Sequence, residues 1–333
     1  MHLAIANEKR SETRPKSISQ YIENIHPILE ENGIVTKLIE FEEKILEDEF
    51  DLIWAPGLGN RRVPPIVMAM PHKSICTIHG INSLFDPLTV KGFGLRKGLG
   101  HFLWRKKIQR DWSNIENNIM HVISVSDLSK TEISKKMNIN INNITRIYNG
   151  IESDFFDLNK NNCGDYIIHV SQYSYVKNIP RLIAAYEIFR KQHDMPLRIV
   201  SINAPEMAVP EGCTIIRDAL TRSEIAELLS RAHVMFMPSI EETFCLPVLE
   251  AMAARVPVVT SLGTGAAEVA GDGAVLVDPL DVSAMAEGLT AAVVDKALRA
   301  VLVERARARA GSLTWRRSAE EHLALFRRLG SRL

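Results

Sequence analysis

The sequence lacks several features that define common classes of protein. Its 333 residues include only four cysteines, which lie far apart and form no Cys-x-x-Cys pair, so neither a disulfide framework nor a zinc site is expected. It contains no run of about 18 apolar residues, so no membrane-spanning helix is expected. The formal net charge of zero predicts no general attraction to nucleic acid. We therefore expect a soluble protein of the reducing cytoplasm.

Signature motifs of two enzyme classes are also missing. A dinucleotide-binding dehydrogenase needs Gly-x-Gly-x-x-Gly after a strand, and "GLGNRR", "GFGLRK" and "GTGAAE" all lack the third glycine. The ten histidines show none of the usual metal-ligand spacings. These absences argue against a dehydrogenase and a metal hydrolase.

What the sequence does contain is a regular alternation of strand-like and helix-like segments. Predicted strands of a first unit lie at 2–6, 35–41, 51–55, 73–80 and 121–126, with a crossover helix over 17–33. After a polar stretch at 157–165, predicted strands of a second unit lie at 165–171, 197–201, 234–238, 256–261 and 274–278. This alternation predicts an α/β fold of two doubly wound parallel-sheet domains, whose ligands bind at the carboxyl ends of the strands.

The composition changes abruptly near residue 200. Asparagine, lysine and isoleucine dominate before that point, whereas no asparagine follows Asn203 and the only later lysine is Lys296. The break falls inside the alternating pattern of the second unit, so we interpret it as two coding histories joined within one domain. The change of composition has two possible origins: a recombined gene and uneven codon drift.

The stretch 241–261, "EETFCLPVLEAMAARVPVVTS", carries the strongest functional signal. Pro247 suits the first turn of a helix, which predicts a helix start at about Leu246. The free amides there carry partial positive charge and suit a phosphate group. Glu242 and Glu250 would flank this cradle as acceptors for hydroxyl-rich groups. The simpler alternative is that Glu250 merely complements the helix dipole and Glu242 is a solvated loop residue.

Residues 235–261 resemble the diagnostic segment of the retaining, nucleotide-sugar-dependent glycosyltransferases with the GT-B architecture. That family reads roughly Pro-Ser-x-x-Glu-Gly-Phe-Gly-Leu-Pro-x-x-Glu-Ala-Met-Ala. The resemblance continues through "TIHG", "ISVSDLSKTEI", "ITRIYNGIESDFF", "VKNIPRLIAAYEIF" and "GAAEVAGDGAVLVDP", so it covers most of the chain from about residue 50. It implies a Rossmann-like acceptor-side domain over 1–158, a donor domain over 165–312, a central cleft between them, and a helix over 313–333 that crosses back to the first domain.

The resemblance also implies roles for individual residues. Glu242 contacts the donor hexose and Glu250 the ribose, while the backbone of Phe244, Cys245 and Leu246 holds the diphosphate or the sugar. The remaining assignments are Lys177 at the leaving diphosphate, His79 at the donor sugar, Gln172 and Arg217 in donor binding, and Ser126 and Asn149 on the acceptor side. No Asp-x-Asp motif is present, so neither a metal nor another cofactor is expected.

The sequence departs from the family pattern in three places. The loop "NEKRSETRPKS" lacks the usual glycine-rich turn, and Gln172 and Val176 stand where an arginine commonly partners the lysine. Thr243, Cys245 and Arg255 occupy positions where the family prefers glycine, which favours positive φ. A catalytically impaired protein that binds a nucleotide-sugar or a partner is therefore the alternative to an active enzyme. A nucleotide-sugar epimerase of the same architecture is a lesser one.

A basic segment at 91–110, "KGFGLRKGLGHFLWRKKIQR", holds seven Lys or Arg residues, no acid and interspersed apolar residues. This composition suits contact with an anionic membrane surface, and the alternative is an ordinary surface helix. The expected function is transfer of a hexose, with retention, from a UDP- or GDP-sugar to a glycan or lipid-linked acceptor in cell-surface polysaccharide or glycolipid synthesis. The expected location is the cytoplasm or the inner face of the cytoplasmic membrane.

Overall fold

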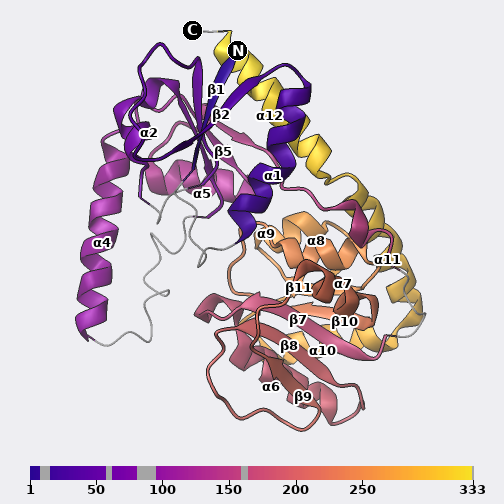
Figure 1. Cartoon of the computed structure of the whole chain (residues 1–333). Coiled ribbons are helices and arrows are strands. Elements are labelled where there is room, and N and C mark those ends of the chain that lie inside the picture. The colour runs from indigo at the N-terminus through magenta and orange to yellow at the C-terminus, as the bar shows by residue number, and fades with distance from the viewer. Residues whose placement is uncertain (8–15, 58–61, 81–94, 159–163, 332–333) are drawn as a thin grey trace. The chain divides into compact units, whose positions relative to one another are not determined.

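A computed structural model of the chain describes residues 1–7, 16–57, 62–80, 95–158 and 164–331 (Figure 1). These residues form two compact units. Unit 1 comprises 1–150 together with 315–333, and unit 2 comprises 151–314. Each unit is built on its own parallel sheet with helices packed against it. The predicted α/β class with two doubly wound domains is therefore confirmed.

Unit 1 contains a six-stranded parallel sheet. Its strands are β1 (His2–Asn7), β2 (Val35–Glu40), β3 (Leu52–Ala55), β4 (Ser74–Ile78), β5 (His121–Ser124) and β6 (Ile144–Arg146). Their order is β2-β1-β3-β4-β5-β6, so the direction of winding reverses between β1 and β3. Its helices are α1 (Lys16–Glu31), α2 (Pro65–Ala69), α4 (Leu95–Ser113), α5 (Asp127–Met137) and α12 (Trp315–Gly330).

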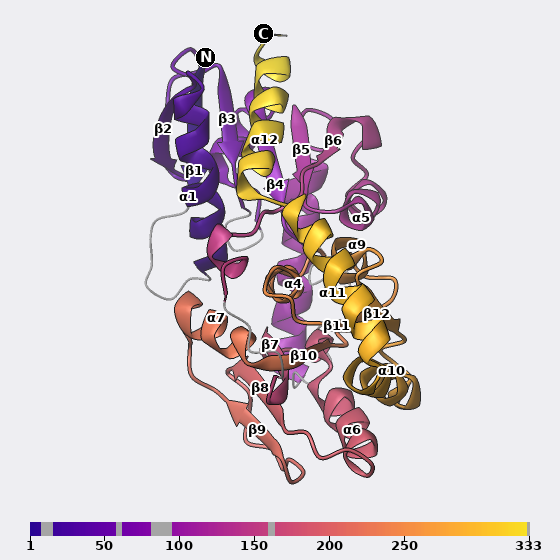
Figure 2. The same ribbon diagram turned by 90° about the vertical axis from the view of Figure 1, so that its right-hand side faces the viewer.

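The sheet of unit 1 is buried between two apolar clusters. One cluster gathers residues such as Ile53, Ile66 and Trp112, and the other gathers Trp54, Tyr21 and Phe326. In the second cluster α12 lies beside α1 (Figure 2). The contact is specific as well as apolar, because the Tyr21 hydroxyl and His322 Nε2 are 2.7 Å apart and both side chains are buried. The last helix of the chain is thus part of the core of unit 1.

Unit 2 also contains a six-stranded parallel sheet, in a different order. Its strands are β7 (Tyr166–Gln172), β8 (Leu197–Ile202), β9 (Cys213–Ile216), β10 (Ala232–Met237), β11 (Val258–Ser261) and β12 (Ala274–Val277). They are arranged β12-β11-β10-β7-β8-β9, so winding reverses between β7 and β10. Its helices are α6 (Ile179–Arg190), α7 (Arg222–Ser230), α8 (Leu246–Ala253), α9 (Gly265–Ala270), α10 (Val282–Val294) and α11 (Lys296–Gly311).

The connection between the units joins unit 2 at Ile151. The Ile151 amide donates to the Leu313 carbonyl (3.1 Å), and a short 3₁₀ turn, η5 (Ser153–Phe155), follows. Phe156 accepts a hydrogen bond from Arg307 through its carbonyl. Residues 151–158, which the sequence interpretation placed with the first domain, therefore make these contacts inside unit 2.

Two edge strands, β6 and β9, were not among the predicted strands. Both are short, each has one buried residue followed by partly buried or exposed ones, and a threonine interrupts the apolar run after the first residue of each. The change of composition at Asn203 falls just after β8, inside unit 2 and not between the units. The polar stretch at 157–165 lies partly outside the described residues.

Candidate active site

The topology of unit 2 points to one edge of its sheet. In doubly wound folds, ligands bind at the carboxyl ends of the strands where the strand order reverses. In unit 2 this place lies between β7 and β10. The loop after β7 includes the short turn η6 (Tyr175–Lys177), and the loop after β10 leads from Pro238 to the start of α8. Most residues that the sequence assigns to the donor stand on these two loops.

The two loops are tied to each other by hydrogen bonds. The Ile240 amide donates to the Val176 carbonyl at 2.7 Å. The buried Asn178 side chain donates to the carbonyls of Pro238 (2.9 Å) and Pro279 (2.7 Å). Asn178 itself has a φ of +60°, which asparagine tolerates better than most residues. These bonds fix the position of Lys177 relative to the residues that follow β10.

Lys177 and Glu242 form the first charged pair of the site. Lys177 Nζ donates to Glu242 Oε1 at 2.6 Å, and the side chains are 22% and 9% exposed. Burial works to lower the pKa of Lys177, but the negative charges nearby, Glu242 foremost, outweigh it and raise the pKa. Lys177 therefore carries its positive charge in this setting.

The start of α8 lies as the sequence predicts, at Leu246 with Pro247 in the first turn. Phe244 and Cys245 are buried just before it, and Cys245 has a φ of +76°. The Gly265 amide, at the start of α9, donates to the Glu242 carbonyl at 2.7 Å. A Cβ on Gly265 would lie 2.2 Å from the Thr243 carbonyl oxygen, so only glycine fits there without a shift of the loop.

Glu250, inside α8, forms the second charged pair. Arg222 Nη1, from the first residue of α7, donates to Glu250 Oε1 at 2.6 Å. The other end of the same guanidinium binds the carboxylate of Glu152. Glu250 is only 4% exposed, and burial raises its pKa while Arg222 opposes the rise. The sequence-predicted helix position of Glu250 is confirmed, and its arginine partner is new.

The other two residues assigned to the donor stand further along the same edge. Gln172 is the last residue of β7 and is exposed. Arg217 follows β9, and it donates to the carbonyls of Ala204 (3.1 Å) and Pro205 (3.2 Å). Arg217 thus holds the loop after β8 in the structure.

The three residues assigned to unit 1 follow its strands β4, β5 and β6. His79 Nε2 lies 2.9 Å from the Pro56 carbonyl, and its ring meets the edge of Tyr21. Burial lowers the pKa of His79 to about 4, so the ring is neutral at physiological pH. Ser126 caps α5 by accepting from the Ser129 amide at 3.0 Å. Asn149 is buried, and its Oδ1 has no hydrogen-bond partner among the described residues.

The basic segment is only partly described, because residues 91–94 lie outside the described part of the chain. From Leu95 onward the segment belongs to α4. Phe102 and Leu103 are more than half exposed, and Lys106 lies over the Phe102 ring at 5.9 Å. Further along, Ile108 is buried in the core of unit 1. The helix therefore combines a packed end with an exposed, basic and apolar stretch.

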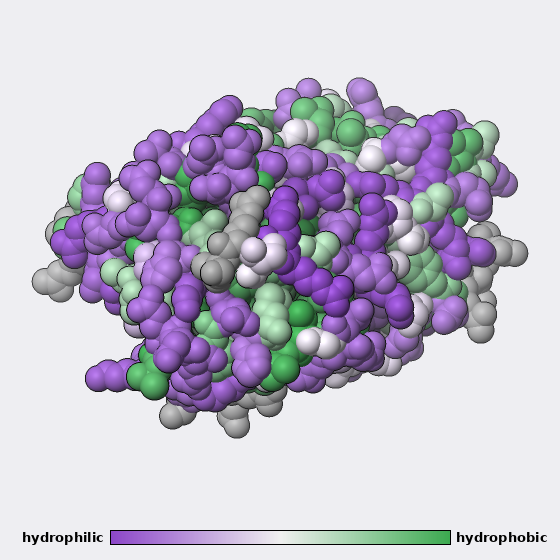
Figure 3. All heavy atoms as spheres, turned by 90° about the horizontal axis from the view of Figure 1, so that it is seen from above, coloured by the Kyte–Doolittle hydropathy of each residue, from purple (hydrophilic) through white to green (hydrophobic). Residues whose placement is uncertain are grey.

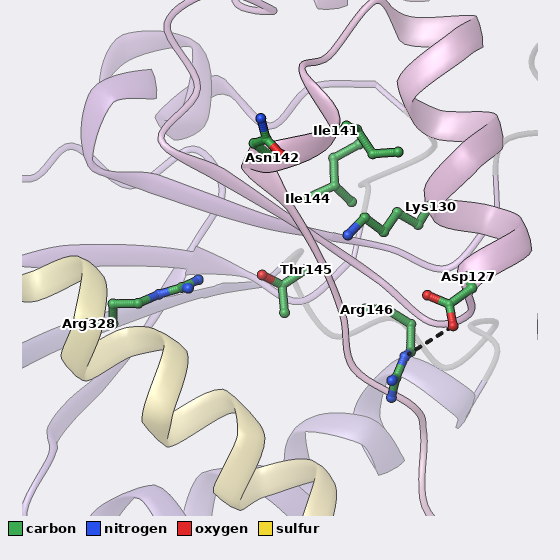
Figure 4. A pocket seen from close by; sticks show the side chains of 8 residues that line it. All are labelled: Asp127, Lys130, Ile141, Asn142, Ile144, Thr145, Arg146 and Arg328. Carbon is green, nitrogen blue, oxygen red and sulfur yellow. Dashed lines mark ion pairs between the residues drawn. The ribbon is translucent and has the colours of Figure 1, made fainter.

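A pocket of about 530 Å³ lies elsewhere, along the edge strand β6 of unit 1 (Figure 4). Its walls include Lys130, Thr145 and Arg328, and Arg146 forms an ion pair with Asp127 at 3.7 Å. None of the residues assigned from the sequence lines it. We place the candidate site at the carboxyl edge of unit 2 because topology, charge and motif coincide there.

Three further observations concern the surface, membrane spans and metal sites. On the face drawn in Figure 3 hydrophilic side chains predominate and apolar ones are scattered. Within the described residues, no helix combines the length and apolar character needed to cross a bilayer. The same residues contain no cluster of three or more His, Cys, Asp or Glu side chains placed to hold a metal ion.

Sequence reasoning missed four residues that shape the site: Asn178, Arg222, Glu152 and Gly265. Asn178 had a local signal, since it stands directly before the Ile-Pro that opens α6. Gly265 opens "GAAEVAGDGAVLVDP", a segment that resembles the family, but the sequence gives it no role of its own. Arg222 and Glu152 gave no signal, because Arg222 meets Glu250 from 28 residues away in sequence and Glu152 meets Arg222 from 70 residues away.

The part of the chain that contains this edge is similar to known proteins. Residues 150–309 match the family model described as "Glycosyl transferases group 1". The O-antigen chain mannosyltransferase B of Escherichia coli is 26% identical over 230 residues, which cover 62% of this chain and 60% of that protein. The O-antigen chain mannosyltransferase RfbU of Salmonella typhimurium is 27% identical over 217 residues, covering 62% and 56%. The chain thus spans a little under two thirds of the length of these relatives.

Solved structures show the likeness of the fold over the whole chain. Sucrose-phosphate synthase from Thermosynechococcus elongatus has a TM-score of 0.74 at 16% identity and covers 100% of both chains. Anabaena Alr3699/HepE in complex with UDP-glucose has a TM-score of 0.70 at 16% identity, with 98% of each chain covered. These structures show a GT-B fold, and residues 150–309 are similar to the glycosyl transferases group 1 family.

Proposed function

We propose that the protein is a retaining glycosyltransferase that moves a hexose from a UDP- or GDP-sugar to a glycan or lipid-linked acceptor in cell-surface polysaccharide or glycolipid synthesis. The observation that carries the proposal is the charged carboxyl edge of unit 2. There Lys177, Glu242, Glu250 and the start of α8 stand where the strand order reverses. The family match covers this same part of the chain.

The chemistry of the site suits a sugar attached to a diphosphate. The amides at the start of α8 and the charge of Lys177 stabilise negative charge as it develops on the leaving diphosphate. Lys177 has three N–H donors, so it can keep its bond to Glu242 and donate another to a phosphate oxygen. Glu242 and Glu250 accept hydrogen bonds from the hydroxyls of the hexose and the ribose. The backbone of Phe244, Cys245 and Leu246 supports the diphosphate or the sugar.

A front-face displacement accounts for retention of configuration. The bond between the anomeric carbon and the phosphate oxygen breaks as the acceptor oxygen bonds to the same face. The acceptor proton passes to the departing phosphate oxygen. In this scheme no side chain acts as a nucleophile, and the electrostatic role falls to Lys177 and α8, without a metal. Gln172 and Arg217 serve the donor, and His79, Ser126 and Asn149 serve the sugar and the acceptor side.

Binding measurements test the donor site directly. We expect UDP or GDP, and the matching UDP-glucose or GDP-mannose, to raise the melting temperature, because a ligand that binds only the folded state stabilises it. At a ligand concentration of about 100 times the Kd, the free energy of unfolding rises by about 2.7 kcal/mol. Mannose is the first sugar to test, since both relatives compared above are named mannosyltransferases. If no nucleotide or nucleotide-sugar shifts the transition at millimolar concentration, the donor site is refuted.

A second candidate is a protein that binds the donor without turning it over. The observation that favours it is Gln172, a neutral and exposed residue where the family commonly has an arginine. Hydrolysis of the bound nucleotide-sugar separates the two functions, because an active transferase releases free sugar slowly even without acceptor. Tight binding with no release of sugar or nucleotide over hours would favour the second candidate.

Contact with a membrane is part of the proposal. The exposed Phe102 and Leu103 stand next to Lys106 and Lys107 on α4, which is a pattern suited to an anionic leaflet. We expect sedimentation with phosphatidylglycerol vesicles at low salt and loss of binding in the double variant Phe102→Ser, Leu103→Ser. Equal sedimentation of both proteins would refute this role of α4.

A further inference from the structure

Glu250 is connected to the segment where the chain enters unit 2. Its Oε1 accepts from Arg222 Nη1 at 2.6 Å, and Arg222 Nη2 binds Glu152. Glu152 directly follows Ile151, which pairs with the last residues before α12. One guanidinium therefore joins three separate segments: the entry to unit 2, the start of α7 and the first turns of α8.

Arg222 is itself held in place by its surroundings. It is the first residue of α7, whose start is fixed by a reciprocal pair of hydrogen bonds between Thr221 and Glu224. Its guanidinium lies over the Phe155 ring at 4.8 Å from the ring centre. A flexible arginine gains little from an exposed ion pair, but a guanidinium fixed by two carboxylates and an aromatic face loses less entropy on binding. The geometry is that of a support and not of a loose surface contact.

The support acts on one oxygen of Glu250 and leaves the other unbound. Within the described residues, Oε1 of Glu250 takes the bond from Arg222, and no bond to Oε2 is formed. A carboxylate can accept about four hydrogen bonds in total, so Oε2 retains full capacity for a sugar hydroxyl. A carboxyl that takes up a proton would become a donor at one oxygen and would lose part of this capacity.

We propose that Arg222 is a positioning residue of the donor site, which holds Glu250 as an oriented carboxylate for the ribose of the nucleotide. This inference rests on the donor site proposed above, because it takes the ribose as the partner of Glu250. It gives Arg222 a part in binding that no comparison of the chain with its relatives supplies. Glu152 completes the support by holding the far end of the guanidinium.

The charged groups around Glu250 give the proposal a pH signature. Burial raises the pKa of Glu250, Arg222 opposes this rise, and Glu152 adds to it; the Cys245 thiol also lies close enough for Glu250 to raise its pKa. Without Arg222 the pKa rises further, so Glu250 takes up a proton at a higher pH. Donor affinity should then fall with decreasing pH over a range in which the wild type is still constant.

The experiment compares four proteins: wild type, Arg222→Met, Arg222→Lys and the control Arg231→Met. Arg231 caps the other end of α7 and pairs with Asp165 at 2.7 Å, with both side chains about half exposed. Calorimetric titration with UDP and GDP, and with their 2′-deoxy forms, gives the Kd of each from pH 5.5 to pH 8.5. The thermal transition of each protein reports whether the fold is kept.

We expect Arg222→Met to raise the Kd for the nucleotide about tenfold at pH 8 and by more at pH 6. Arg222→Lys should recover part of the lost affinity. The 2′-deoxy nucleotide should lose affinity in the wild type and lose much less in Arg222→Met, because the oriented acceptor is gone. Arg231→Met should match the wild type. If Arg222 has only a structural role, Arg222→Met will lower the melting temperature. It will then leave unchanged both the pH dependence of the Kd and the loss of affinity for the 2′-deoxy nucleotide, and this result would overturn the inference. If the wild type binds neither UDP nor GDP, the proposed function falls and this inference falls with it.

Discussion

The carboxyl edges of the two sheets differ in their chemistry. In unit 2 two carboxylates, the partly buried Glu242 and the buried Glu250, are each held by a cation at 2.6 Å. In unit 1 the residues assigned to the corresponding edge are uncharged: His79, with a pKa of about 4, the helix cap Ser126 and the amide Asn149. Both sheets are parallel and doubly wound, so the fold alone does not produce the difference.

The contrast matches what each partner in sugar transfer demands. A nucleoside diphosphate carries charge and many hydroxyls, and fixed cations, carboxylates and helix amides suit it. A sugar acceptor is largely neutral, and neutral donors and acceptors suffice for it. Under the proposed function, the charged pairs of unit 2 bind the donor, and the uncharged His79, Ser126 and Asn149 serve the sugar and the acceptor side. The predictions below set each unit against the other or against a matched position.

The largest expected effect concerns the ion pair of unit 2. Lys177→Ala and Glu242→Ala should each lower kcat by about 10²–10³, the scale for removal of one preorganised charge partner in an active site. The matched control is Lys37→Ala in unit 1, which breaks a surface pair with Glu49 of 3.0 Å. Steady-state rates of donor hydrolysis and of transfer measure the change, and circular dichroism checks the fold.

Near-wild-type turnover in either unit 2 variant would remove these residues from the mechanism. An equal loss in Lys37→Ala would mean that the assay reports general stability. In that case the difference between the ion pair of unit 2 and the surface pair of unit 1 would say nothing about function.

The sequence was sufficient for the fold class and for the outline of the site. The long buried strands and the helix start at Leu246 were predicted because periodicity and proline chemistry act locally. The short edge strands β6 and β9 were not, since three or four partly exposed residues carry no clear pattern. Positive φ at Cys245 and Arg255 is observed although neither residue is glycine, so the chain adopts a left-handed backbone there at some cost.

The parts of the site that depend on distant contacts could not be predicted. No local rule pairs Arg222 with Glu250, or Gly265 with the backbone of Thr243. These contacts arise because parallel strands bring loops that are distant in sequence to one edge. Motif matching finds residues that touch the ligand by type, but residues that support them are found only in the structure.

Acid should destabilise both units through buried histidines. Burial lowers the pKa of His322 in unit 1 and of His169 in unit 2 from 6.5 to about 4. Because each folded pKa lies below the unfolded value, the neutral ring stabilises the fold above pH 6.5, and this contribution is lost as pH falls from 6.5 to 4. The loss is about 3 kcal/mol for each histidine. Urea unfolding at a series of pH values measures it.

Single variants assign this pH dependence to one unit or the other. His322→Gln should reduce the pH dependence of the transition of unit 1, where burial also lowers the pKa of His79 to about 4, and His169→Gln should flatten that of unit 2. Tryptophan fluorescence follows unit 1 selectively, because Trp54, Trp104, Trp112 and Trp315 all lie in unit 1. If His322→Gln loses stability between pH 6.5 and pH 4 as steeply as the wild type, the buried ring is not the cause.

A smaller effect tests whether the position of the Glu242 loop matters. In Gly265→Ala the new methyl meets the Thr243 carbonyl, and in Gly164→Ala it meets the Ala232 carbonyl carbon at 2.3 Å, at the other end of the same sheet. Both should destabilise unit 2 by about 1–3 kcal/mol. Only Gly265→Ala should weaken donor affinity, because only it displaces the loop that carries Glu242. Equal donor affinity in the two variants would mean that the position of the Glu242 loop does not affect donor binding.

The smallest expected effect compares two helix ends. Arg255 follows α8 in unit 2 with a φ of +58°, and Asn138 follows α5 in unit 1 with a φ of +54°. Arginine is strained in this conformation, whereas asparagine tolerates it. Because Arg255 is exposed, its replacement by glycine removes little buried surface. Arg255→Gly should therefore raise the free energy of unfolding by about 0.5–1 kcal/mol after the entropy of glycine in the unfolded chain is counted. Asn138→Gly should change the free energy of unfolding by only a few tenths of a kcal/mol. Denaturant titration of the two variants measures both changes. A gain of the same size at both positions would show that the effect belongs to helix termination generally and not to strain at Arg255.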